Sequence, residues 1–113
     1  MELGVGGEAE ILLIDDDNLI YKYYSYNNNM TGYENKSKVA DGLIKFKRSC
    51  FKHPDYINYP KYIKKGLIKI ENSYNCWNVS DDGYDMMAIR FIGRLFQEYH
   101  FERSIPKKLA IHY

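Results

Sequence analysis

Only one stretch of this chain carries an apolar repeat of helical period, and it comes late in the sequence. In residues 83–102 apolar side chains recur at intervals of three and four residues. The positions of this stripe are Ala88, Phe91, Ile92, Leu95, Phe96 and Tyr99. A helix with a single apolar stripe must bury it against another layer, so the rest of the 113-residue chain has to supply that layer.

The ends of this helix are predicted from its flanking residues. Ser80, Asp81 and Asp82 supply an N-cap and an acidic first turn, and Pro106 ends the segment. Gly93 weakens the helix by about 1 kcal/mol relative to alanine. We expect a close contact between helix and sheet to explain that glycine.

The other apolar segments are short and β-prone, which predicts strands. The predicted strands are residues 8–15, 18–26, 42–51, 64–71 and 107–113. Aspartates 15–17 and Asn18 lie between the first two and predict a β-hairpin turn. The fourth strand is expected to continue past a bulge through Tyr74, Cys76 and Trp77. Residues 52–63 contain two prolines and cannot form one regular element throughout.

The predicted order is therefore β-β-loop-β-β-α-β within a single domain, residues 1–113. Short connections between consecutive strands favour antiparallel pairing. We predict an α+β fold, with a mostly antiparallel sheet of about five strands and the single helix on one face. Residues 27–40 form a long polar segment without periodicity, and such a loop is either mobile or functional.

Charge is distributed unevenly along the chain, although the net charge is only +1. Residues 1–35 hold seven acids and one base, and residues 36–70 hold ten bases and two acids. Either these segments attract each other within the fold, or they present two oppositely charged surfaces to partners.

The sequence points to a cytoplasmic protein with no membrane partner. Its first residues lack the basic and apolar regions of a signal peptide, and no apolar run is long enough to span a membrane. Only Cys50 and Cys76 are present, and reduced thiols are the default in a cytoplasm. We expect both thiols to be buried and inert.

Tyrosine is abundant, with 12 copies, and four of them fall in the second predicted strand. Tyrosine suits protein interfaces because it combines a large apolar area with a polar tip. We predict a protein-binding surface for a basic partner, or for a second copy as a homodimer. Its residues are Tyr21, Tyr23, Tyr24 and Tyr26, with Asp16 and Asp17 of the turn. The alternative is ordinary aromatic packing within a sheet.

The basic segment 36–70 supports a second hypothesis, nucleic-acid binding through phosphate contacts and base stacking. Its candidate residues are Lys45, Lys47, Arg48, Lys52, Tyr59, Lys61, Tyr62, Lys64 and Lys65. The alternative is a pair of solvated strand faces whose lysines prevent aggregation at the sheet edge.

No catalytic, cofactor or metal site is predicted. Asp15, Asp16 and Asp17 lack the spacing of a calcium loop and are interpreted as a turn. The histidines, His53, His100 and His112, have no partner at metal-ligand spacing. A third hypothesis is a small hydrolase that uses His53 or His100 with Glu102 and Arg103. The glycines at 4, 6 and 7 lack the preceding strand and following helix of a phosphate loop.

In size and in tyrosine and asparagine content, the chain resembles small immunity or accessory proteins encoded beside bacterial toxins or on mobile elements. No motif carries this resemblance, so it implies a role but assigns no site residues. The leading hypothesis is a non-catalytic module that binds another protein.

Overall fold

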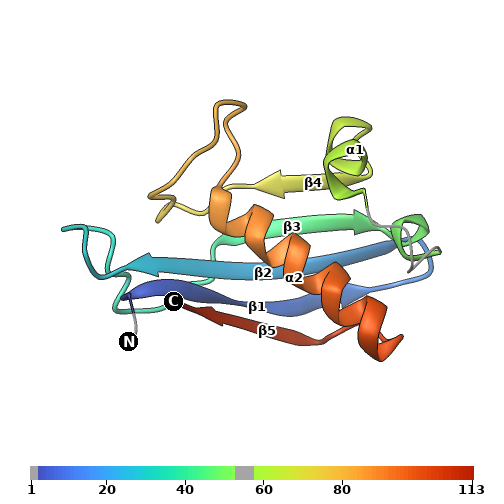
Figure 1. The fold of residues 1–113 in the computed structure, drawn as a ribbon, viewed down its shortest axis with the longest axis horizontal. Helices are drawn as coiled ribbons and strands as arrows, with labels where there is room; N and C mark the ends of the chain where they lie inside the picture. The colour runs from blue at the N-terminus through green and yellow to red at the C-terminus, as the bar shows by residue number, and fades with distance from the viewer. Residues whose placement is uncertain (1–2, 53–57) are drawn as a thin grey trace.

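A five-stranded antiparallel sheet with one long helix across one face forms the body of the protein (Figure 1). The computed structural model describes residues 3–52 and 58–113. The strands are β1 (Val5–Ile14), β2 (Asn18–Asn27), β3 (Gly42–Lys47), β4 (Ile68–Glu71) and β5 (Lys108–His112). The helices are α1 (Tyr59–Lys64) and α2 (Met86–Glu102), and a 3-10 turn covers Arg48–Phe51. The predicted α+β class and antiparallel sheet are confirmed.

The strand order is β4-β3-β2-β1-β5, so β5 joins the sheet beside the first strand. Helix α2 makes this possible by crossing diagonally from the β4 side to the β5 side (Figure 1). In the part of the chain that the structure describes, the opposite face of the sheet carries no helix. We call this uncovered side the open face.

The aspartate turn joins β1 to β2, as predicted from the sequence. One oxygen of Asp15, Oδ1, accepts hydrogen bonds from the backbone N–H groups of Asp17 (2.9 Å) and Asn18 (2.7 Å). These two bonds favour the charged carboxylate and hold the pKa of Asp15 below its ordinary value. The carboxylate therefore replaces missing backbone partners in the turn.

Strand β3 is shorter than predicted and ends at Lys47 instead of residue 51. Cys50 and Phe51 are both buried. Adjacent residues of a strand face opposite sides of the sheet, so a strand could not bury both toward one core. The 3-10 turn at Arg48–Phe51 solves this conflict by rotating both side chains inward.

Strand β4 is also shorter than predicted, because helix α1 and the glycine turn at Gly66 precede it. Sequence reasoning did not identify α1. Its signal is Asn58, which accepts a hydrogen bond from the Lys61 N–H (3.3 Å), followed by Pro60 in the first turn. The expected extension of the strand through Tyr74 and Trp77 is wrong, because residues 72–78 form a loop. Predictions that concern residues 53–57 lie outside the described residues.

Helix α2 begins later than predicted, with Asp85 as its N-cap instead of residues 80–82. Residues 80–84 form a separate tight turn, in which the Gly83 N–H donates to the Ser80 carbonyl (2.9 Å) and the Tyr84 N–H donates to Ser80 Oγ (3.1 Å). Because Ser80 is already hydrogen-bonded within that turn, the helix is capped by Asp85 instead.

Gly93 does not serve the close contact between helix and sheet that the sequence led us to expect. A methyl group built on it would meet Tyr59 of α1, at 3.9 Å from the hydroxyl oxygen. That is an ordinary van der Waals distance, so the glycine is not forced by packing in the described part of the chain.

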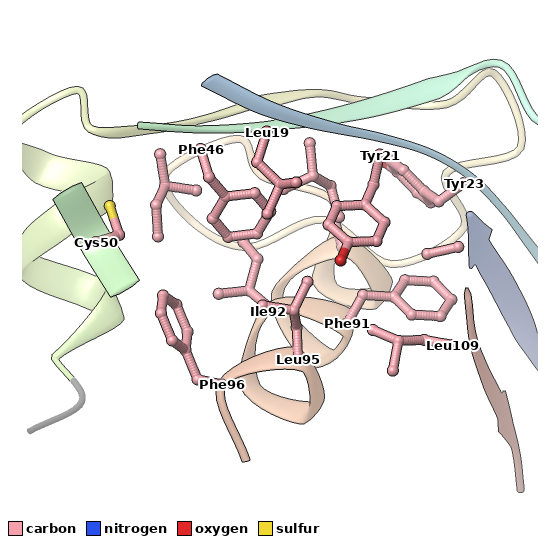
Figure 2. Close-up of a cluster of buried hydrophobic side chains, with 14 of the residues drawn as sticks. Leu19, Tyr21, Tyr23, Phe46, Cys50, Phe91, Ile92, Leu95, Phe96 and Leu109 are labelled. Atoms are coloured by element: carbon pink, nitrogen blue, oxygen red, sulfur yellow. The ribbon is translucent and has the colours of Figure 1, made fainter. Parts of the chain in front are cut away.

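The core lies between α2 and the covered face of the sheet (Figure 2). The apolar stripe predicted for the helix is confirmed: Ala88, Phe91, Ile92, Leu95 and Phe96 are buried, and Tyr99 packs at the edge. The sheet supplies Leu19, Tyr21, Tyr23, Phe46 and Leu109 to the same cluster (Figure 2). Figure 2 also shows Cys50 at one end of this layer.

One polar contact is enclosed in this apolar layer. Asp85 has no exposed surface, and its Oδ2 accepts a hydrogen bond from the Tyr23 hydroxyl at 2.7 Å. Its Oδ1 caps the helix by accepting from the Met87 N–H (3.0 Å). The Tyr23 oxygen in turn accepts from the Ser73 N–H (3.2 Å). Burial and the neighbouring Asp85 carboxylate raise the pKa of Tyr23, so its hydroxyl keeps its proton.

The substitution Tyr23→Phe is expected to lower the free energy of unfolding by about 3 kcal/mol, since it removes the buried hydrogen bonds of the hydroxyl to Asp85 Oδ2 and to the Ser73 N–H. Urea unfolding followed by circular dichroism measures this. The matched control is Tyr21→Phe, which removes an equally buried hydroxyl that donates only to the Pro106 carbonyl. We expect the control to cost about 1 kcal/mol. Equal losses in the two variants would contradict the role given to Asp85.

Candidate interaction surfaces

Strand β2 distributes its four tyrosines over both faces of the sheet. Tyr21 and Tyr23 face α2 and are 1% and 0% exposed. Their rings are packed among the core side chains (Figure 2). In the folded protein they contact no partner, so the predicted protein-binding surface does not include them.

Tyr24 and Tyr26 lie on the open face. Tyr24 lies opposite Glu8 of β1, and burial, followed by the charge of Glu8, raises the pKa of Tyr24 to about 12. The Tyr26 hydroxyl lies 2.8 Å from Nδ1 of His112. Strand register places Gly6 of β1 between these two residues.

Gly6 allows Tyr26 to cross β1 and reach His112. A methyl group at Gly6 would lie 2.9 Å from the Tyr26 hydroxyl and 2.2 Å from the Ile111 carbonyl oxygen. The glycine-rich start of the chain is thus part of strand β1, where packing explains it.

The segment between β2 and β3 forms a hollow with the open face. Its volume is about 550 Å³, and a smaller hollow of about 220 Å³ adjoins it. Tyr24, Glu8 and Lys38 line both of them. The larger hollow is completed by Tyr26, Asn28, Glu34, Asn35, Lys36 and His112. Sequence reasoning identified the loop but not the strand residues that face it.

The acidic turn and the basic segment meet in the structure. The Arg48 guanidinium donates a hydrogen bond to the Asp15 carbonyl (3.0 Å). Asp16 and Asp17 line one shallow hollow together with Lys47, Arg48 and Lys52. The charge segregation along the sequence is therefore partly neutralised within the fold, which is the first of the two interpretations above.

The basic residues proposed for nucleic-acid binding lie in three places, of which one is the 3-10 turn with Arg48 and its C-cap Lys52. Lys45 and Lys47 point from β3 to the open face, where Lys45 is directly opposite Lys69 of β4. Lys61, Lys64 and Lys65 belong to α1 and its C-cap. Lys45 also forms an ion pair with Glu71 at 3.3 Å.

The two tyrosines of that candidate set are turned toward the core. The Tyr62 ring lies 6.2 Å from the ring of Phe96, measured between centroids. Tyr59 is half-buried and packs on the same cluster. The lysines of the open face therefore have no aromatic stacking platform from these two residues.

The β1–β2 hairpin extends beyond β5 and exposes three consecutive aliphatic side chains. Leu12, Leu13 and Ile14 are 56%, 44% and 46% exposed. The register of β1 with β5 ends at Glu10, followed by one hydrogen bond from the Ile11 N–H to the Lys107 carbonyl (2.8 Å). The outer edge of residues 12–14 has no strand partner within the described part of the chain. We call Leu12, Leu13 and Ile14 the apolar tip.

Sequence reasoning missed the apolar tip because it treated residues 8–15 only as the first strand of a β-hairpin. The available signal was the run Ile11, Leu12, Leu13 and Ile14, which has no alternation. A run without alternation requires cover on both faces, and β1 lacks such cover at this end. A bulge between Ile11 and Leu13 also shifts the register there.

A separate groove of about 720 Å³ lies where α1 approaches the start of α2. Its walls are mainly apolar, with Tyr59, Pro60 and Ile63 on one side and Met86 and Ile89 on the other. Lys64 and Asp82 line it as well.

The residues of the hydrolase hypothesis do not form a described site. His100 lies in the last turn of α2, with its ring 5.3 Å from that of Phe101. Glu102 and Arg103 follow at the exposed helix end, and His53 lies outside the described residues. In residues 3–52 and 58–113, no three acidic, histidine or cysteine side chains are grouped to hold a metal ion.

Both thiols are held in the protonated form. Cys50 is buried in the core, and burial raises its pKa. Burial, followed by the adjacent Asp85 carboxylate, raises the pKa of Cys76 to about 11. A nucleophilic role needs the thiolate, which these surroundings disfavour.

Comparisons with protein-family models, curated proteins and solved structures found no match for this chain. Within the described residues, none of the helices has the length and apolar character needed to cross a membrane.

The raised pKa predicts slow labelling of Cys76 by a disulfide reagent. At pH 8 a thiol of pKa near 11 holds roughly a hundredfold less thiolate than an ordinary cysteine. In a Cys50→Ala variant, native Cys76 should react correspondingly more slowly than in urea, with a rate that rises up to about pH 11. Native labelling at pH 8 as fast as in urea would contradict this environment.

Proposed function

We propose that this protein is a non-catalytic interaction module that binds another protein through the apolar tip of its β1–β2 hairpin. The observation that carries the proposal is the run of three half-exposed aliphatic side chains on an unpartnered strand edge. Exposed apolar side chains beside unpaired backbone are a template for contact with another chain.

The partner in this proposal is a different protein with an apolar cleft and basic residues around it. Asp16 and Asp17 are exposed next to the apolar tip and favour a basic rim. Three half-exposed side chains offer much less than the roughly 800 Å² that each subunit of a standard interface buries. Two tips side by side would thus make a weak homodimer, whereas a cleft that encloses the hairpin buries more of it.

This role agrees with the resemblance in size and composition to immunity or accessory proteins, which act by binding. We place this interaction in the cytoplasm, where free thiols such as those of Cys50 and Cys76 are the default. The Tyr24 and Tyr26 part of the originally predicted surface is not needed for it, because both rings are engaged with open-face neighbours.

A second candidate function, nucleic-acid binding, is favoured by one observation. Lys45 and Lys69 face each other directly across β3 and β4, with Lys47 next along the strand. Like charges placed opposite each other destabilise a sheet unless a counter-charge neutralises them. Glu71 supplies one such charge, and a phosphate backbone would supply more.

The protein-binding proposal predicts that the double variant Leu12→Asp, Leu13→Asp loses its partner, because charged side chains cannot enter an apolar cleft. Tagged protein is used to capture partners from a lysate of the native host, and capture should fall at least tenfold. The matched control is Val39→Asp, Val79→Asp, whose wild-type residues are 55% and 52% exposed elsewhere. Equal capture by both variants, or no partner for the wild type, would overturn the proposal. Light scattering should find a monomer.

For the second candidate, fluorescence anisotropy with single-stranded and duplex probes at low salt is decisive. Binding through phosphates must weaken as salt rises, and the triple variant Lys45→Glu, Lys47→Glu, Lys69→Glu should abolish it. Arg94→Glu on the exposed side of α2 serves as the charge control. Absence of salt-sensitive binding by the wild-type protein would exclude this function.

A further inference from the structure

The long loop between β2 and β3 is held in place by several hydrogen bonds. The Asn27 N–H donates to the Tyr33 carbonyl (2.9 Å), and the Asn35 side chain donates to the Ser25 carbonyl (3.0 Å). From the far loop before α2, the Asn75 side chain donates to both of these carbonyls, at 2.9 Å and 2.8 Å. A long loop without secondary structure is mobile or functional, and these bonds favour the second possibility.

The loop encloses the hollow of about 550 Å³ on the open face, a size typical of sites for small molecules. Strand residues form one side of it, and the loop forms the other. Tyr24, Tyr26 and His112 come from the strands, whereas Lys36 and Lys38 come from the loop.

The carboxylates in this hollow already have partners. Glu8 lies opposite Tyr24 in the sheet and 3.9 Å from the Lys108 ammonium group. Glu34 accepts from the Gly32 N–H with both oxygens, at 3.1 Å and 3.3 Å. These contacts reduce the demand of either carboxylate for another cation.

The lysines of the loop, in contrast, form no ion pair with a described acid. Among the described residues, Lys36 and Lys38 have no acidic group within ion-pair distance. His112 uses Nδ1 for Tyr26, and its Nε2 has no hydrogen-bond partner in that same part of the chain. Lys36 and Lys38 are thus the cations of this lining that no described acid neutralises.

Lys38 is also held in a strained backbone conformation. Its φ is +52°, in the left-handed region that lysine rarely adopts. Two contacts fix it there: the Lys38 N–H donates to the Asn35 carbonyl (3.0 Å), and the next N–H, of Val39, donates to Asn35 Oδ1 (3.4 Å). Strain of this kind is concentrated where proteins hold ligands.

We propose that this hollow is a binding site for a small organic anion that carries a phosphate or carboxylate group. The anionic group lies between Lys36, Lys38 and His112, and the rest of the ligand contacts the tyrosines of the open face. Charge complementarity with the two unmatched lysines selects the anion. The hollow lies away from the apolar tip, so this inference does not depend on the proposed protein partner.

Nuclear magnetic resonance of ¹⁵N-labelled protein tests the site, with inorganic phosphate, citrate and adenosine monophosphate as probes at millimolar concentration. We expect saturable shifts of the amide signals of Glu8, Tyr24, Lys38 and His112. Phosphate and citrate distinguish the two anionic groups, and the nucleotide should bind at least threefold more tightly than inorganic phosphate if the tyrosines contribute. The absence of saturable shifts at these residues with every probe would overturn the proposal.

The double variant Lys36→Gln, Lys38→Gly removes both charges and relieves the strained backbone. It should bind the best probe at least tenfold more weakly while unfolding at a higher urea concentration, which separates lost binding from lost structure. The matched control is Arg94→Gln, Lys107→Gln, two exposed cations outside the hollow, and it should keep wild-type affinity. Equal weakening by both double variants, or undiminished binding by the first, would show that the anion does not occupy this site.

Discussion

The buried hydrogen bond between Asp85 and Tyr23 joins the start of the long helix to the central strand of the sheet. Asp85 begins α2, Tyr23 lies in the middle of the sheet, and Ser73 donates to the same hydroxyl from the loop that follows β4. A carboxylate is costly to bury without partners, so this arrangement tolerates only one position for the start of the helix. With that end fixed, α2 must cross the sheet toward β5, and its apolar stripe covers a single face (Figure 1).

The remaining surfaces follow from this choice of face. One helix cannot cover both sides of five strands, so the open face carries lysines, glutamates and the two outer tyrosines of β2. The sheet is also uneven at its ends, because β1 has ten residues and β5 only five. The apolar tip is the part of β1 that β5 does not reach, and the loop after β2 closes over the other end.

Periodicity predicted the type of each long element but not the face that it buries. The alternation in residues 18–26 placed tyrosines on both faces, and only the position of α2 decides that Tyr21 and Tyr23 are core residues. The predicted boundaries of α2 and β3 were wrong for two reasons. At Ser80 a local hydrogen bond competed with the helical pattern, and at Cys50 and Phe51 two adjacent side chains are both buried. The hollow at the loop combines residues from β1, β2 and β5, and a sequence does not reveal that strand order.

The two proposed surfaces lie at opposite ends of the β1–β2 hairpin, which has consequences for how they act together. Glu8 and Tyr24 are paired across the hairpin near the hollow, whereas Leu13 is paired with Ile20 near the apolar tip. A partner enclosing the tip therefore leaves the hollow open, and an anion in the hollow leaves the tip accessible. Both sites share strands β1 and β2, so the register of this hairpin is one structural connection between them, beside the pairing of β1 with β5.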